Sequence, residues 1–151
     1  HLSTIENYLS TLEKCFHITL VKPFHKNLRK EIVKMPKVYF NDLGLRNALL
    51  NRFSKFKERE DTGALLENYV YQRLVQIYPQ EDIKFWRTAD GNEVDFVVSS
   101  DYKSGKAYEV KTSSIENKPT KYKKFTENYP NINLSIIAYN SRNKNIPIIA
   151  L

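Results

Sequence analysis

The stretch GNEVDFVVSSDYKSGKAYEVKTSS, residues 91–114, decides the fold. Its two runs of β-branched and aromatic residues, 93–98 and 106–112, are typical of strands. Gly105 lies between them, where the chain must turn. We therefore predict that the two runs are neighbouring strands of one sheet.

The charged side chains of these strands are predicted to gather on one side of the sheet. Successive residues of a strand point to opposite faces, so Asp95 points away from the apolar residues that flank it. In the second strand, Glu109 and Lys111 point away from Tyr108 and Val110 in the same way. When the apolar faces of the two strands are matched, Asp95, Glu109 and Lys111 cluster on the opposite face.

This cluster has the chemistry of a metal-dependent phosphodiester site. Asp95 and Glu109 supply hard oxygen ligands for Mg²⁺, and Lys111 can orient an attacking water and stabilise charge on a phosphate. Glu67 flanks the apolar stripe of a preceding helix and is expected to point at the same place. The alternative is a cross-strand ion pair on a solvated face, which contributes little. The residues alone leave both interpretations open.

The order of elements around these strands predicts the fold class. An apolar stripe at helical spacing predicts a helix over 63–77, formed by Leu66, Tyr69, Val70, Leu74 and Ile77, with Thr62 as its N-cap. Apolar and aromatic runs predict further strands at 83–88, 133–139 and 146–151, and a basic helix at 118–129. The resulting order, α-β-β-β-α-β-β, predicts an α/β (α+β) domain over 62–151 with a central mixed sheet and flanking helices.

Residues 1–51 are predicted to form a smaller unit. A capping box at Ser3 and Glu6 starts a helix over 4–14, strands follow at 16–21 and 37–40, and Asp42 caps another helix. Helix, strand, basic loop and strand is the order of the second half of a winged helix. A small α/β packing unit is the alternative. The polar run at 52–61 is interpreted as a linker.

Charge points to an anionic partner. The 151 residues carry 24 Lys+Arg against 17 Asp+Glu, a net charge of +7. The densest basic stretch spans residues 22–37, and such a patch attracts phosphate backbones. Its candidate DNA-binding residues are Lys22, Lys26, Arg29, Lys30 and Lys34. A solvated hairpin tip is the alternative.

Several classes of protein are excluded or disfavoured. No apolar run approaches the roughly 20 residues needed to cross a bilayer, so no membrane partner is expected. Cys15 is the only cysteine, which excludes an internal disulfide and indicates a reducing, cytoplasmic setting; we expect Cys15 to be buried. Trp86 is expected in the core or at its rim, and the lysines of 118–124 either line a DNA-binding rim or keep a helix solvated.

The chain also resembles known proteins. The order helix Glu, strand Asp and E-x-K strand resembles the PD-(D/E)xK, or restriction-endonuclease-like, nuclease fold. Over about residues 3–115 the chain resembles the C-terminal region of prokaryotic AAA-type P-loop ATPases. The matching segments are TIENYL (4–9), KVYFNDLGLR (37–46), GALLENYV (63–70), FWRT (85–88), EVDFV (93–97) and EVKTS (109–113).

The resemblance implies a set of roles for the chain. It implies a DNA-interacting region that follows an ATPase module and a winged helix, with the nuclease positions Glu67, Asp95, Glu109 and Lys111 and Mg²⁺ as cofactor. No GxxxxGK[ST] motif occurs here, so ATP is expected only in the ATPase module, through which the protein would form a homo-oligomer. The absence of an initiator Met fits a fragment of a longer protein. An active Mg²⁺-dependent endonuclease and a protein-interaction module are the alternatives.

Overall fold

The computed structural model describes residues 2–25, 35–113, 119–139 and 146–147. A two-stranded antiparallel sheet, β1-β2, stands beside a five-stranded sheet in the order β3-β4-β5-β6-β7. In chain order the elements are α1 (Leu2–Lys14), β1 (Ile18–Val21), β2 (Lys37–Phe40), α3 (Leu43–Leu49), a 3-10 turn (Phe56–Glu58), α4 (Thr62–Leu74), a 3-10 turn (Gln80–Asp82), β3 (Ile83–Arg87), β4 (Glu93–Val98), β5 (Gly105–Lys111), α5 (Pro119–Asn128), β6 (Ile132–Ala138) and β7 (Ile146–Pro147).

The larger sheet is mixed, as predicted. β3, β4 and β5 are antiparallel neighbours, whereas β6 lies parallel to β5 and β7 lies parallel to β6. The chain reverses sharply before β5, where a Cβ on Gly105 would lie 2.2 Å from the carbonyl oxygen of Val98. Only glycine allows so close an approach, and the reversal fixes the register of β4 against β5.

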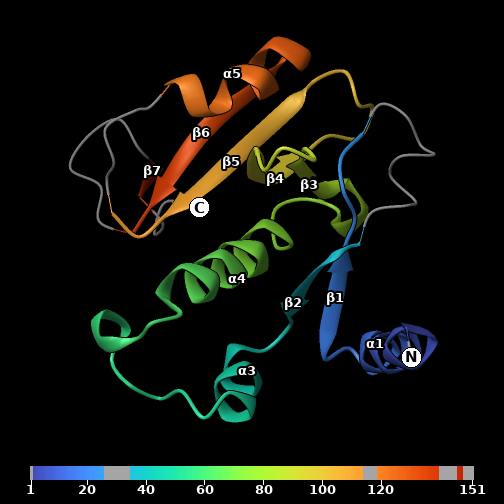
Figure 1. Ribbon diagram of the computed structural model, residues 1–151, viewed down its shortest axis with the longest axis vertical. Coiled ribbons are helices and arrows are strands. Elements are labelled where there is room, and N and C mark those ends of the chain that lie inside the picture. Colours follow the sequence, from blue (N-terminus) through green and yellow to red (C-terminus); the bar gives the residue numbers. More distant parts are fainter. Residues whose placement is uncertain (1, 26–34, 114–118, 140–145, 148–151) are drawn as a thin grey trace.

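Helices cover both faces of this sheet (Figure 1). α4 packs on one face through buried residues that include Leu66, Val70 and Leu74, against Phe96 among others. α5 packs on the other face, where Phe125 contacts Trp86 edge-on. The expectation that Trp86 lies in the core is confirmed, since it is 3% exposed. The prediction of a mixed α/β (α+β) fold with flanking helices is therefore correct.

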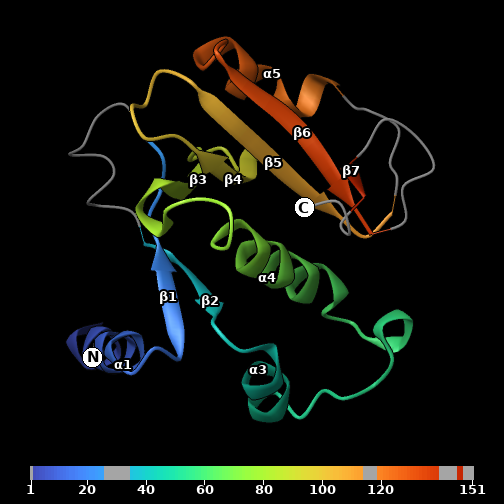
Figure 2. The same ribbon diagram turned by 180° about the vertical axis from the view of Figure 1, so that it is seen from behind.

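The β1-β2 unit shares its core with the larger sheet. Val21 and Tyr39 belong to the same buried cluster as the α4 face of that sheet. The chain after β1 runs along the edge of β3, where the Phe85 amide donates to the carbonyl of Lys22 over 3.1 Å. Figure 2 shows β1 leading directly from α1 up to β3. β1 and β2 are thus packed against the second unit.

The region from 52 to 61 is more than a solvated connection. The Arg59 side chain is 4% exposed and donates to Asp61, which also accepts from Arg46 over 2.8 Å. This pairing lowers the pKa of Asp61: the hydrogen bond from Arg59 is the largest effect and outweighs burial. Because its carboxylate is occupied, Asp61 precedes α4 without a side-chain cap, and Thr62 is the first helical residue rather than the cap.

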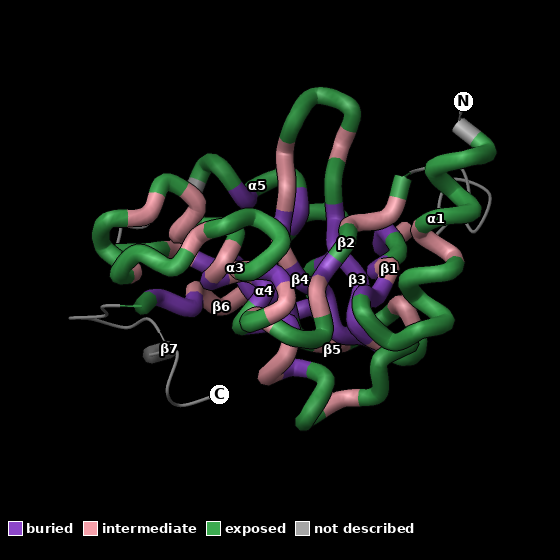
Figure 3. The backbone as a smooth tube through the Cα atoms, turned by 90° about the horizontal axis from the view of Figure 1, so that it is seen from below, coloured by how far each residue is buried: buried purple, intermediate pink, exposed green. Residues whose placement is uncertain are grey.

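Two predicted helices differ in which residues they bury. α4 ends at Leu74, and its buried side includes Asn68 and Tyr71, whereas Ile77 is 50% exposed. α1 already includes Ser3, so the predicted capping box does not start it. Figure 3 shows α1 on the outside of the molecule, with its surface largely exposed. Cys15, expected to be buried, is exposed because the end of this helix stands clear of the core.

None of the helices in the described ranges combines the length and the apolar character that crossing a membrane requires.

Candidate active site

Glu109, near the end of β5, is the most deeply buried charged residue of the predicted site. Its side chain is 3% exposed, and one oxygen, Oε1, accepts from Lys121 of α5 over 2.7 Å and from Lys111. The other oxygen, Oε2, is buried and accepts no hydrogen bond from the residues that the structure describes. A buried carboxylate oxygen in that state is costly, so this position has an unused capacity to bind a cation or a donor.

The charge of Glu109 affects its neighbours. Burial alone would lower the pKa of Lys121, but the contact with Glu109 outweighs it and raises that pKa. The pKa of the Tyr122 hydroxyl is also raised, first by burial and then by Glu109. Both shifts reflect the position of the Glu109 side chain between β5 and α5.

Asp95 of β4 lies beside Glu109. The register pairs Phe96 with Tyr108, and continuing it by one residue places Asp95 opposite Glu109. The Val110 amide donates to Asp95 Oδ2 over 2.8 Å, which holds the carboxyl group against the β5 backbone. The prediction that the two acids sit on adjacent strands is confirmed.

Asp95 holds its proton more tightly than an ordinary carboxyl group. Its side chain is 14% exposed, and burial is the main cause that raises its pKa to about 7. The negative charges of Glu67 and Glu109 add to this effect, whereas Lys37 and the Val110 amide oppose it. Asp95 is therefore linked electrostatically to the acids on both sides of the site.

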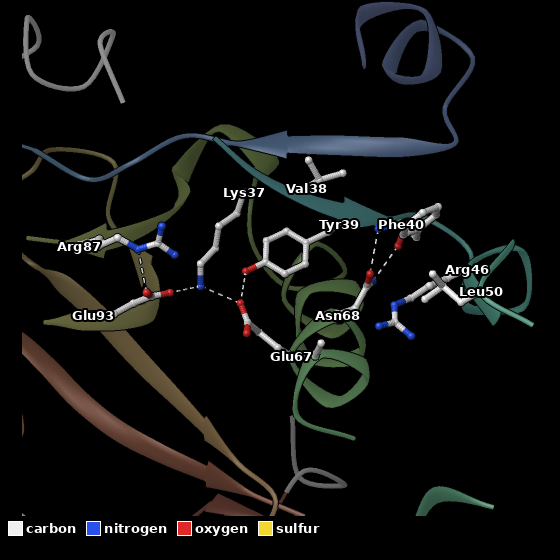
Figure 4. A pocket seen from close by; sticks show the side chains of 11 residues that line it. Lys37, Val38, Tyr39, Phe40, Arg46, Leu50, Glu67, Asn68, Arg87 and Glu93 are labelled. Carbon is white, nitrogen blue, oxygen red and sulfur yellow. Dashed lines mark hydrogen bonds and ion pairs between the residues drawn. The ribbon is translucent and has the colours of Figure 1, made fainter. Parts of the chain in front are cut away.

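Glu67 of α4 reaches the site but is held by groups from β2. Its Oε1 accepts from Lys37 Nζ over 2.8 Å and from the Tyr39 hydroxyl over 2.5 Å (Figure 4). The same ammonium contacts Glu93 and lies 3.7 Å from Asp95 Oδ1. Burial opposes the charge of Lys37, but Glu67 and Asp95 outweigh it and raise the pKa of this lysine.

Lys37 and Glu93 were not predicted from the sequence as catalytic candidates. A signal was present, because Lys37 and Tyr39 are two residues apart in one strand, as are Glu93 and Asp95 in another, and such pairs share a face. The two strands are far apart in the sequence, so nothing in the pattern brought them together. A cavity of about 410 Å³ opens beside Lys37, Glu67 and Glu93 (Figure 4).

The four predicted residues are linked to one another, partly by electrostatic influence and partly by direct contact. Glu67 and Glu109 both act on Asp95, and Lys111 contacts Glu109. Within the described ranges, however, no three His, Cys, Asp or Glu side chains are arranged to hold a metal ion. Glu109 Oε2 is buried without a donor among the described residues and is open to a cation, whereas Glu67 is occupied by Lys37 and Tyr39.

Most of the predicted DNA-binding residues fall outside the described part of the chain. Lys26, Arg29, Lys30 and Lys34 lie there, and Lys22 is exposed. The basic patch therefore stays a prediction.

On α5, three lysines are paired with acids, which favours their solvating role over a DNA-binding rim. The pairs are Lys121 with Glu109, Lys123 with Glu127 and Lys124 with Asp90.

Comparison with known proteins gives two family matches. Residues 62–148 match the family described as "Domain of unknown function (DUF4143)", and residues 1–55 match the one described as "Domain of unknown function (DUF8612)". The chain is 28% identical over 116 residues to "Uncharacterized protein Mb2031c" of Mycobacterium bovis and to "Uncharacterized protein Rv2008c" of Mycobacterium tuberculosis. Each match covers 74% of this chain and 26% of the relative. The chain thus spans about a quarter of the length of these curated relatives. No solved structure matches it.

Proposed function

The chain belongs to the DUF4143 family, a domain found in AAA-ATPase-associated proteins. On that premise we propose that it is the DNA-interacting region of a larger ATP-binding protein, and that it carries a metal-dependent nuclease-type site at β4 and β5. The observation that carries the proposal is Glu109, a buried carboxylate whose Oε2 accepts no hydrogen bond among the described residues. Its position opposite Asp95, with Lys111 in contact with it, supports a role in phosphodiester hydrolysis.

The roles of the residues follow from their contacts. Asp95 and Glu109 would hold a divalent cation, which would lower the pKa of a bound water and neutralise charge on the scissile phosphate. The Val110 amide fixes the Asp95 carboxyl group, so this ligand needs little reorganisation. Lys111 keeps an ammonium beside Glu109, where it would stabilise negative charge on an attacking water or a phosphate oxygen.

Plasmid nicking tests the catalytic part of this proposal. We expect the longer protein that contains this region to nick supercoiled DNA with Mg²⁺ or Mn²⁺, and Glu109→Gln to abolish the activity. Glu127→Gln is the matched control, because this acid is 64% exposed on the same side of the sheet and pairs only weakly with Lys123. Cleavage that survives Glu109→Gln, or no cleavage by the parent protein with either metal and ATP, would overturn the catalytic assignment.

DNA binding is tested separately, by fluorescence anisotropy with a labelled duplex. The affinity should fall steeply with salt concentration, because phosphate contacts release counterions. Reversing the charges of Lys26, Arg29 and Lys30 should weaken binding and reduce the salt dependence. Binding that is unchanged by these reversals would exclude the 22–37 stretch as the contact surface.

A further inference from the structure

Lys37 places one ammonium group among three carboxylates. Its Nζ lies 2.8 Å from Glu67, contacts Glu93, and lies 3.7 Å from Asp95. An ammonium has three N–H donors and no acceptor, so it can serve several carboxylate oxygens at once. The side chain is only 15% exposed, and solvent therefore screens these contacts poorly.

The position of this ammonium is set by folded structure on both sides. Lys37 is the first residue of β2 and pairs with Val21 of β1. β2 is fastened to α4 by Asn68, whose amide group both donates to and accepts from the backbone of Phe40, over 2.8 and 2.9 Å. Tyr39 adds its hydroxyl to Glu67. The Lys37 ammonium is thus held in place by β2, which packs on α4, the helix that carries Glu67.

We propose that Lys37 is an autoinhibitory cation, which the β1-β2 unit holds in the carboxylate cluster and which competes with a divalent cation for Asp95. This inference rests on the proposed function, because it concerns the same site. A divalent cation bound at Asp95 would stand next to the ammonium, and two positive charges at that separation in a partly buried site repel each other strongly. Displacement of β2 from α4 would remove the ammonium and release the carboxylates together.

The surrounding contacts allow Lys37 to be removed without dismantling the cluster. Glu67 would keep the Tyr39 hydroxyl, and Glu93 would keep Arg87, whose Nε donates to it over 2.8 Å. Lys111 and Lys121 do not take the same place, since both bind Glu109 instead. The effect of Lys37 on the cation is therefore separable from that of the other lysines.

Isothermal titration calorimetry with MnCl₂ tests the inference on the full chain. At pH 8, above the pKa of about 7 of Asp95, we expect Lys37→Met to bind Mn²⁺ at least about tenfold more tightly than the parent, and Lys37→Arg, which keeps the positive charge, to bind like the parent. Lys124→Met is the matched control, because it removes an ammonium from the exposed acid Asp90. Adding Asp95→Asn to Lys37→Met should abolish the gain.

The outcomes distinguish this inference from the proposed function. Equal Mn²⁺ affinity of parent and Lys37→Met would overturn autoinhibition but leave the metal site standing. A gain that persists with Asp95→Asn would place the ion elsewhere and overturn the inference. No Mn²⁺ binding by any variant at millimolar metal would overturn both. Circular dichroism checks the fold, and Lys37→Gln repeats the test if Lys37→Met is unfolded.

Discussion

The titration of Asp95 gives a stability prediction that can be worked out from the structure. Its carboxyl group is mostly buried between Glu67 and Glu109, and burial followed by those two charges raises its pKa from 3.8 to about 7. The unfolded chain loses this proton near pH 4, whereas the folded protein keeps it until about pH 7. The folded state therefore binds more protons in this interval, and its stability must fall as the pH rises.

The magnitude follows from the two pKa values. One pH unit corresponds to about 1.4 kcal/mol, so the rise from 3.8 to about 7 corresponds to at most about 4 kcal/mol. Asp95→Asn removes the titration but keeps a side-chain oxygen that can accept from the Val110 amide. Relative to the parent, this variant should gain up to that amount of unfolding free energy between pH 4 and pH 7.

Urea unfolding in metal-free buffer with a chelator, at pH 4.5 to 8, measures this difference. Asp101→Asn is the control, because backbone amides lower the pKa of this exposed acid to about 2, and its effect should be constant over the same range. A difference between Asp95→Asn and the parent that is flat, or that shrinks as the pH rises, would refute the reasoning about the buried carboxyl group.

Two further substitutions test the framework that positions the site. Asn68→Ala leaves the N–H and C=O of Phe40 without their side-chain partner inside the protein. It should therefore lower the unfolding free energy by about 2–3 kcal/mol, and a loss below about 0.5 kcal/mol would show that the contact between β2 and α4 is weak. Gly105→Ala puts a Cβ 2.2 Å from the Val98 carbonyl oxygen and should lower the unfolding free energy by about 3 kcal/mol or more. Gly63→Ala, in a helix with no atom within 4 Å of the added Cβ, should change the unfolding free energy by less than about 1 kcal/mol. Thermal unfolding compares the two variants, and equal melting temperatures would contradict this account.

The part of the site built on neighbouring strands was predictable from the sequence. Alternation along β4 and β5 has a period of two residues, and Gly105 fixes the reversal between them. Matching the apolar faces of the two strands was therefore enough to predict that Asp95 and Glu109 lie opposite each other. The same local logic predicted the Asp42 cap, whose Oδ1 accepts from the Leu45 amide over 2.6 Å.

The part that depends on contacts between distant segments was not predictable. Lys37 and Glu67 are 30 residues apart in the sequence, and their contact requires β2 to dock on α4 through Asn68. An asparagine beside a helical stripe gives no sign of the strand that it will bind. For the same reason the exposure of α1, where Tyr8 is 68% exposed, was not predictable: a helical stripe indicates which side is apolar, but does not indicate what covers it.

The electrostatics of Asp95 connect the two halves of the site. Glu67 and Glu109 raise its pKa and Lys37 lowers it, so a positive charge beside Asp95 favours its ionised form. A divalent cation would act in the same direction and with twice the charge. Lys37 can therefore stabilise the carboxylate form that a metal requires while occupying the place of the metal. The carboxyl groups of such a site are assembled before any cation arrives, and withdrawal of β2 would expose them.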